Sequence, residues 1–192
     1  GTKSRNGKIG EEDKVKIGNV NPDLTGGFAL NAHAFGFDLA ANFNFSIGNQ
    51  VYNANKIECT QTGKYQYRNM ITEMADGKRW TNLNEDGTLT MWSPYTSKMV
   101  LTDWAIEKAS FLRLNTLTLG YTIPQSITKR VGINSLRFYA TAYNVFTITD
   151  YSGFDPESDC IKKSGQESLT PSCDYSGYPR SRSFVFGLNL NF

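Results

Sequence analysis

The last ten residues of the chain alternate between apolar and polar side chains. Apolar residues occupy every second position from Phe184 to Phe192, and Ser183, Gly187 and two asparagines lie between them. Because successive side chains of a β-strand point to opposite faces, this pattern gives one apolar and one polar face. Nine or ten residues exceed the roughly five or six of a usual strand and match the length that crosses a bilayer at a tilt. Segment 183–192 thus suggests an outer-membrane β-barrel strand, although an edge strand of a soluble sandwich also has two such faces over a shorter length.

Four further segments decide between these two interpretations, because they show the same alternation over similar lengths. They are segments 28–34, 37–47, 110–123 and 135–149. A change of phase near Asn115 predicts a β-bulge in the third of them. The tight connection at Phe35-Gly36 predicts that the first two form an antiparallel hairpin. Five long strands favour the membrane barrel.

The connections between these segments alternate between short and long. Segments 34–36 and 124–134 are short, and the second is expected to carry one helical turn; segments 49–109 and 150–182 are long. Outer-membrane barrels have short periplasmic turns and long extracellular loops, so Phe192 is expected at the periplasmic end. Within the first long loop, the spacing of Tyr67, Met70, Ile71 and Met74 predicts one short amphipathic helix.

Five strands do not close a barrel. Single-chain bacterial barrels have an even number of strands, at least about eight, and an open sheet edge in lipid leaves backbone groups unpaired. We therefore expect an all-β fold in which residues 1–192 form the C-terminal five strands of a larger transmembrane antiparallel β-barrel. Such a segment is not an autonomous domain.

Composition excludes several classes of function. The net charge is +2 and the basic residues are scattered, which argues against nucleic-acid binding. His33 is the sole histidine, so neither a Ser/His/Asp triad nor a metal site with Cys/His spacing can be built, and we expect no enzyme, metal or cofactor. Cys160 and Cys173 lie in one polar loop and predict a disulfide in an oxidising compartment; unpaired thiols are the alternative.

Short motifs along the whole chain carry a family resemblance. In order they are Asn21-Pro22 with Thr25 to Phe28, Gly48-Asn49 with Val51 to Asn55, Ala109 to Leu114, Leu117 to Pro124, Leu136 to Thr141 with Asn144 to Phe146, Tyr151 to Glu157, and Tyr178 to Arg180. In order and spacing these motifs resemble the SusC/RagA-like TonB-dependent transporters of Bacteroidota outer membranes.

The resemblance implies a 22-stranded barrel filled by an N-terminal plug. It also implies a multi-pass protein of the bacterial cell outer membrane, a SusD-like surface lipoprotein acting as a lid, and energy from TonB with ExbB and ExbD. The cargo would be a large nutrient, either a glycan oligosaccharide or a peptide. Two alternatives stay open: a soluble β-sandwich binding module or adhesin, and a barrel without active transport.

Few residues are candidates for a specific role. The C-terminal aromatic Phe192 resembles the signal read by the barrel-assembly machinery, and an interfacial anchor is the alternative. Trp80, Trp92 and Trp104 in the long loop are candidates for contact with substrate or lid, although packing of the loop would equally use them. Arg137 is expected to face the barrel lumen.

Overall fold

The computed structural model describes residues 15–60, 69–72, 103–159 and 172–192. Two compact units are present. The first contains residues up to 20, 50–107 and 158–176, and the second contains residues 21–49, 108–157 and 177–192. Each unit is described by itself.

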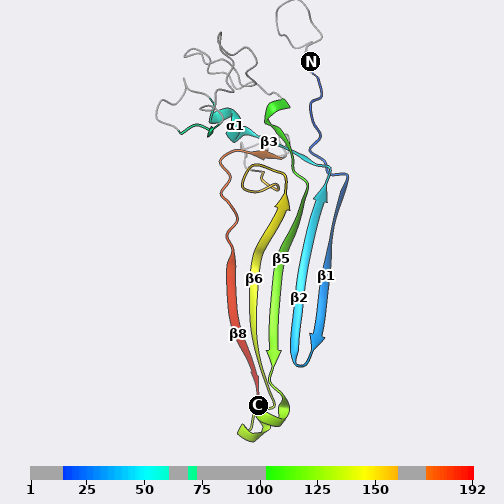
Figure 1. Cartoon of the computed structure of the whole chain (residues 1–192), viewed down its shortest axis with the longest axis vertical. Coiled ribbons are helices and arrows are strands. Elements are labelled where there is room, and N and C mark those ends of the chain that lie inside the picture. The colour runs from blue at the N-terminus through cyan, green and yellow to red at the C-terminus, as the bar shows by residue number, and fades with distance from the viewer. Residues whose placement is uncertain (1–14, 61–68, 73–102, 160–171) are drawn as a thin grey trace, which may run out of the picture. The chain divides into compact units, whose positions relative to one another are not determined.

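The second unit is a five-stranded antiparallel sheet (Figure 1). Its strands, in spatial order, are β1 (Leu24–Ala34), β2 (Phe37–Ile47), β5 (Phe111–Thr122), β6 (Ser135–Thr149) and β8 (Ser183–Asn191). All five predicted strands are therefore confirmed. They contain 11, 11, 12, 15 and 9 residues, which is long enough to cross a bilayer at a tilt.

Strands β1 and β2 form the predicted hairpin. Phe35 and Gly36 occupy its tip with φ of 52° and 85°, and Ala34 pairs with Phe37. The first strand begins at Leu24, earlier than the sequence pattern predicted. Gly26 has no side chain with which to show the alternation, and a Cβ there would lie 2.8 Å from the Phe45 ring.

The paired strands β5 and β6 are irregular at the same point of their pairing. Asn115 on β5 has no partner between the pairs Leu114 with Phe146 and Thr116 with Tyr143, which confirms the predicted bulge. On β6, two residues lie between the corresponding partners Tyr143 and Phe146. The first of them, Asn144, has a positive φ of 52°.

The two faces of the sheet differ in chemistry. The register places apolar residues of neighbouring strands side by side, as in the row Leu30, Ala41, Leu117, Ala142 and Phe184. The rings of Phe28 and Phe43 stack at 4.7 Å. Many of these side chains are exposed, including Leu30 and Phe186 at 57% and 79%. So large an exposed apolar surface is typical of a surface that meets lipid or another protein.

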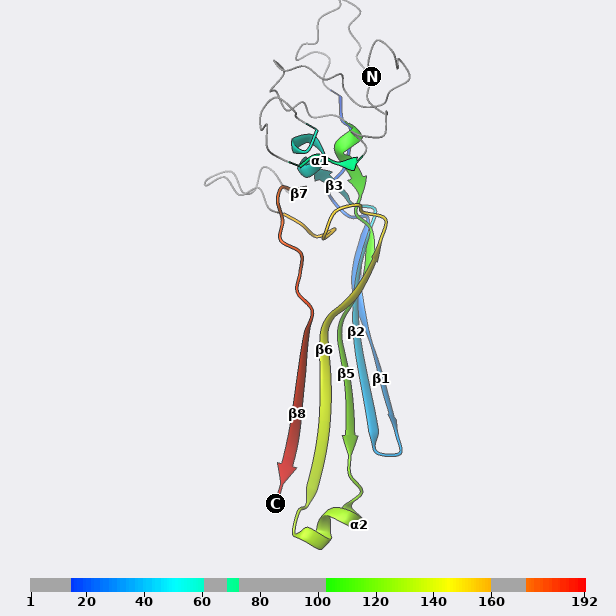
Figure 2. The same ribbon diagram turned by 60° about the vertical axis from the view of Figure 1, so that its left-hand side comes forward.

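The β5–β6 connection carries the expected helical turn. It consists of α2 (Gln125–Thr128) and the 3-10 turn η4 (Lys129–Val131), and Gly132 ends it with φ of 77°. Figure 2 shows this connection at the end of the sheet where β1 turns into β2 and where β8 ends.

The first unit contains short elements that the sequence pattern did not reveal. Strands β4 (Ile106–Lys108), β3 (Gln50–Asn53) and β7 (Cys173–Asp174) form a small sheet, next to α1 (Ala54–Glu58) and η3 (Asp103–Ala105). Elements of two to five residues are too short to show a period. Two residues of the predicted helix, Tyr67 and Met74, lie outside the described residues, and its other two, Met70 and Ile71, are not helical. Among the described residues, no helix combines the length and apolar character needed to span a membrane.

Candidate functional site

The polar face of the sheet carries a bidentate ion pair. Arg137 on β6 donates from Nε and Nη2 to the two carboxylate oxygens of Asp38 on β2, at 2.9 and 2.5 Å. The pair crosses β5 above Gly120, where a Cβ would fall 2.5 Å from Asp38 Oδ1. A side chain at this position would therefore require the ion pair to shift.

A second glycine on this face makes room for an aromatic ring. Tyr139 of β6 lies over Gly187 of β8, its register partner, and the Arg137 guanidinium lies 5.3 Å from the centre of the Tyr139 ring. One row further along, the hydroxyl groups of Thr118 and Thr141 are 3.0 Å apart. The polar face thus presents hydroxyl, phenol and paired charged groups.

A cluster of four charged residues lies on the same unit, and we call it the loop cluster: Arg113, Asp155, Glu157 and Arg180. Arg113 of β5 is at its centre and is 2% exposed. Its Nε donates to Thr147 at 2.9 Å, its Nη2 to Asp155 at 2.6 Å, and its Nη1 to Glu157. All three nitrogens of a buried guanidinium are therefore satisfied.

Arg180 completes the loop cluster from the segment that leads into β8. It pairs with Asp155 and, at 3.2 Å, with Glu157, so two arginines balance two carboxylates. Asn144 also holds this segment, because its side-chain amide donates to the carbonyls of Arg180 and Ser181. Asparagine tolerates the left-handed backbone that this bulge position requires. The ion pairs thereby link the residues that precede segment 158–176 to those that follow it.

The electrostatics of the loop cluster favour the ionised form of Asp155. Burial raises the pKa of Asp155, but the backbone N–H of Glu157 and the guanidinium groups of Arg113 and Arg180 lower it, and the net result lies below the ordinary value of 3.8. Asp155 is therefore a carboxylate at neutral pH. Its contacts are those of a structural anchor and not of a general acid.

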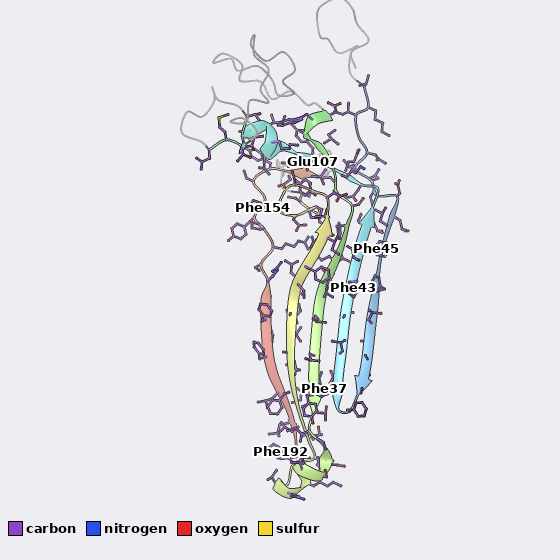
Figure 3. All side chains as sticks on the ribbon, viewed as in Figure 1. Phe37, Phe43, Phe45, Glu107, Phe154 and Phe192 are labelled. Carbon is purple, nitrogen blue, oxygen red and sulfur yellow. The ribbon has the colours of Figure 1, made fainter. Side chains whose placement is uncertain are left out.

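Trp104 is the one tryptophan candidate within the described residues, and it belongs to the first unit. The Lys56 ammonium lies 4.7 Å from the centre of its ring and 3.3 Å from Glu107, and Asn53 donates to the same Glu107 oxygen. Figure 3 labels Glu107. A cation thus lies over one face of the indole ring.

The remaining predicted residues differ in what the structure shows of them. Trp80, Trp92 and Cys160 lie outside the described residues, so the disulfide with Cys173 stays a prediction. Cys173 itself is buried in β7. Phe192 directly follows β8 and is 80% exposed (Figure 3). In the described part of the chain, no group of three His, Cys, Asp or Glu residues is placed to hold a metal ion.

Sequence reasoning did not identify the loop cluster. A signal was present in three motifs of the family resemblance. Each contains one or two charged residues in an otherwise uncharged stretch: Ala109 to Leu114, Tyr151 to Glu157 and Tyr178 to Arg180.

Comparison with known proteins identifies relatives of one kind, although no family model matches the chain. The chain is 31% identical over 188 residues to TonB-dependent receptor P3 of Formosa agariphila and 29% identical over 192 residues to TonB-dependent receptor SusC of Bacteroides thetaiotaomicron. Each match covers 97% of this chain but only 18% and 17% of the relative. The chain therefore spans less than a fifth of the length of these relatives.

Solved structures agree with the sequence relatives. The fold matches the RagAB peptide importer in its closed-closed state with a TM-score of 0.75 at 28% identity, over 96% of this chain and 19% of that chain. A further structure of the RagAB peptide transporter matches with a TM-score of 0.76 over the same shares. Over nearly its whole length the chain thus matches TonB-dependent receptors of the SusC/RagA-like kind, and its five long strands correspond to a section of the wall of such a receptor barrel.

Proposed function

We propose that this chain forms part of an outer-membrane receptor that imports large nutrients, oligosaccharides or peptides, with energy from TonB, ExbB and ExbD and under a SusD-like lipoprotein lid. The observation that carries the proposal is the two-faced sheet of five strands with 9 to 15 residues each. One face is apolar and exposed, and the other carries the Arg137–Asp38 pair and the threonine and tyrosine rows.

Each face has a physical task in this function. The apolar face meets hydrocarbon, where an unpaired polar group costs several kcal/mol, and the strand ladders satisfy the backbone groups of the interior strands. The polar face lines the lumen. Because Arg137 and Asp38 neutralise each other across Gly120, this part of the wall offers hydrogen bonds without a strong field that would hold one sign of cargo.

The loop cluster contributes a fixed base for one long loop. Arg113 holds Asp155 and Glu157, and Arg180 closes the base from the other side. Extracellular loops of a receptor with a lid have to meet both cargo and lid reproducibly, and rigid anchoring lowers the entropy lost in such contacts. We propose this as the role of the cluster in import.

The cargo class is the open part of the proposal. Likeness to a peptide importer supports peptide cargo, and the family resemblance implies oligosaccharide cargo as well. Trp104 is a candidate contact for either, because an indole stacks on sugar rings and packs on peptide side chains.

Deletion of the complete receptor gene tests the function. We expect the deletion strain to lose growth on either a defined oligosaccharide or a defined peptide mixture as sole source, and the intact gene to restore it. Uptake of labelled cargo should stop when a protonophore removes the energy for TonB. Mass spectrometry of the purified receptor should identify bound cargo of the same class and the lipoprotein.

Two results would contradict the proposal. Normal uptake of both nutrient classes in the deletion strain would exclude the import function. Extraction of the protein without detergent would instead favour the soluble binding module, because a sheet with this exposed apolar face needs detergent or lipid when it belongs to a barrel.

A further inference from the structure

One end of the sheet exposes large apolar side chains in its turns, where polar turn residues are usual. Phe35 at the tip of the β1–β2 hairpin is 98% exposed, and Ile127 and Val131 of the β5–β6 connection are 59% and 71% exposed. The register places both turns at the same end, since Phe37 pairs with Tyr121 and Tyr121 with Phe138 (Figure 2). We call Phe35, Ile127 and Val131 the turn-end patch.

Phe35 has a backbone conformation that is unfavourable for a large side chain. The residue has φ of 52°, a left-handed conformation that glycine and asparagine adopt easily and a bulky residue rarely adopts. Because Phe35 is 98% exposed, packing within the described unit does not offset this backbone cost. Its large apolar surface therefore points to a medium or partner that covers it.

The charges beside the patch indicate what covers it. Ile127 and Val131 both lie on the helical run of α2 and η4, and Lys129 and Arg130, which lie between them in sequence, are exposed as well. Within the described residues neither cation has an ion-pair partner. Asp38, a carboxylate of the neighbouring strand end, is already held by Arg137. Apolar side chains flanked by free cations suit the boundary between acyl chains and anionic headgroups.

We propose that the turn-end patch docks on anionic phospholipids of the periplasmic leaflet, with Lys129 and Arg130 binding the lipid phosphate and the apolar side chains entering the headgroup layer. This rests on the proposed function, which places these short turns at the periplasmic end of an outer-membrane barrel. The patch then fixes the depth of the barrel wall in the membrane at this end.

Lipid retention by the complete receptor tests the charge component. The receptor is inserted in nanodiscs of phosphatidylethanolamine with phosphatidylglycerol, stripped stepwise with detergent, and its bound lipids are counted by native mass spectrometry. We expect the Lys129→Gln/Arg130→Gln variant to lose phosphatidylglycerol retention by about fivefold for each removed cation. The control Lys108→Gln, which removes an exposed cation at the other end of β5, should behave like the wild type.

Depth quenching tests the apolar component. Tryptophan in the Phe35→Trp variant should be quenched by lipids with a nitroxide near the headgroup and less by lipids with a nitroxide at mid-chain. Equal phosphatidylglycerol retention in the double variant and the control, or a tryptophan that no lipid nitroxide quenches, would overturn the inference. Failure of the receptor to enter nanodiscs at all would instead contradict the proposed function, so the two failures are distinguishable.

Discussion

Arg113 and Asp155 lie 42 positions apart in the chain, and Arg113 Nη2 lies 2.6 Å from Asp155 Oδ1 in a site from which solvent is nearly excluded. The contact joins the start of β5, the central strand of the sheet, to the loop that follows β6. Each guanidinium nitrogen of Arg113 makes a hydrogen bond and its side chain is 2% exposed, whereas Arg180, the second arginine, has a side chain that is 51% exposed. The two arginines are therefore not equivalent.

Replacement of Arg113 is expected to weaken the receptor more than replacement of Arg180. Arg113→Gln leaves two carboxylates with one partner in a buried site, and breaking a buried ion pair typically costs about 3–5 kcal/mol. Arg180→Gln removes a half-exposed partner and should cost about 1 kcal/mol or less. Urea unfolding of the receptor in detergent, with protease nicking of segment 158–176, measures both. The exposed Arg182→Gln serves as the control, and equal effects of the two cluster variants would contradict this ranking.

The loop cluster should resist acid down to low pH. Because the pKa of Asp155 in the folded protein lies below its unfolded value of about 3.9, its ionisation stabilises the fold fully above that value. The stabilisation is lost only as pH falls through the lower, folded pKa. Protease nicking of segment 158–176 should stay constant from pH 7 to about pH 4 and rise below it. Asp155→Asn should show no such rise, and a transition near pH 6 in the wild type would contradict the assignment to Asp155.

A side chain at Gly120 should disrupt the ion pair that passes over it. Gly120→Ala places a Cβ 2.5 Å from Asp38 Oδ1 and forces Asp38 and Arg137 apart. In the Asp38→Ala/Arg137→Ala background the same change should be nearly neutral, because the shortened side chains vacate the space. Stability of the four proteins, measured as a double-mutant cycle, should give a coupling of about 1–3 kcal/mol. Additive effects would show that the clash does not exist.

The strands and one of the bulges were predictable because the period of side chains carries that information. One extra residue at Asn115 reverses the phase of β5, so the sequence itself shows the break. The bulge at Asn144 was missed for a physical reason: two extra residues on β6 restore the phase, and the alternation reads as unbroken. The first four residues of β1 were missed because Gly26 and Gly27 have no side chains.

The contacts of the loop cluster were not predictable from periodicity. They depend on which loop returns to which strand: Arg113 lies in β5, whereas Asp155 and Arg180 lie towards the two ends of the long connection 150–182. The small sheet of the first unit was missed for a different reason. Tyr52 pairs in parallel with Cys173, which is 121 positions away, and the paired stretch is only two residues long. No local pattern therefore indicates this pairing.

The two faces of β5 should respond oppositely to charge. Leu117 lies on the apolar face opposite Ala41 and Ala142, and Thr116 lies on the polar face opposite Asn42 and Tyr143. Leu117→Arg should destabilise the barrel by about 2–4 kcal/mol, the cost of an arginine near the bilayer midplane, and Thr116→Arg should cost far less. Unfolding of the receptor from liposomes measures both. Similar costs would contradict the assignment of the faces.

Replacement of Phe192 separates the two roles considered for it. As an assembly signal, Phe192→Ala should lower the amount of receptor that reaches the outer membrane while the assembled fraction stays as stable as the wild type. As an interfacial anchor, the same change should leave the amount unchanged and lower the stability by about 1.5–3 kcal/mol, the contribution of a buried phenylalanine. Heat-modified electrophoresis of outer membranes measures the amount, and urea unfolding measures the stability. Phe154→Ala is the matched control, since Phe154 is a loop phenylalanine with 75% exposure against 80% for Phe192. We expect the first outcome, because β8 pairs with β6 over its full length and Phe192 extends beyond the last pair, where it is accessible to a partner protein during insertion.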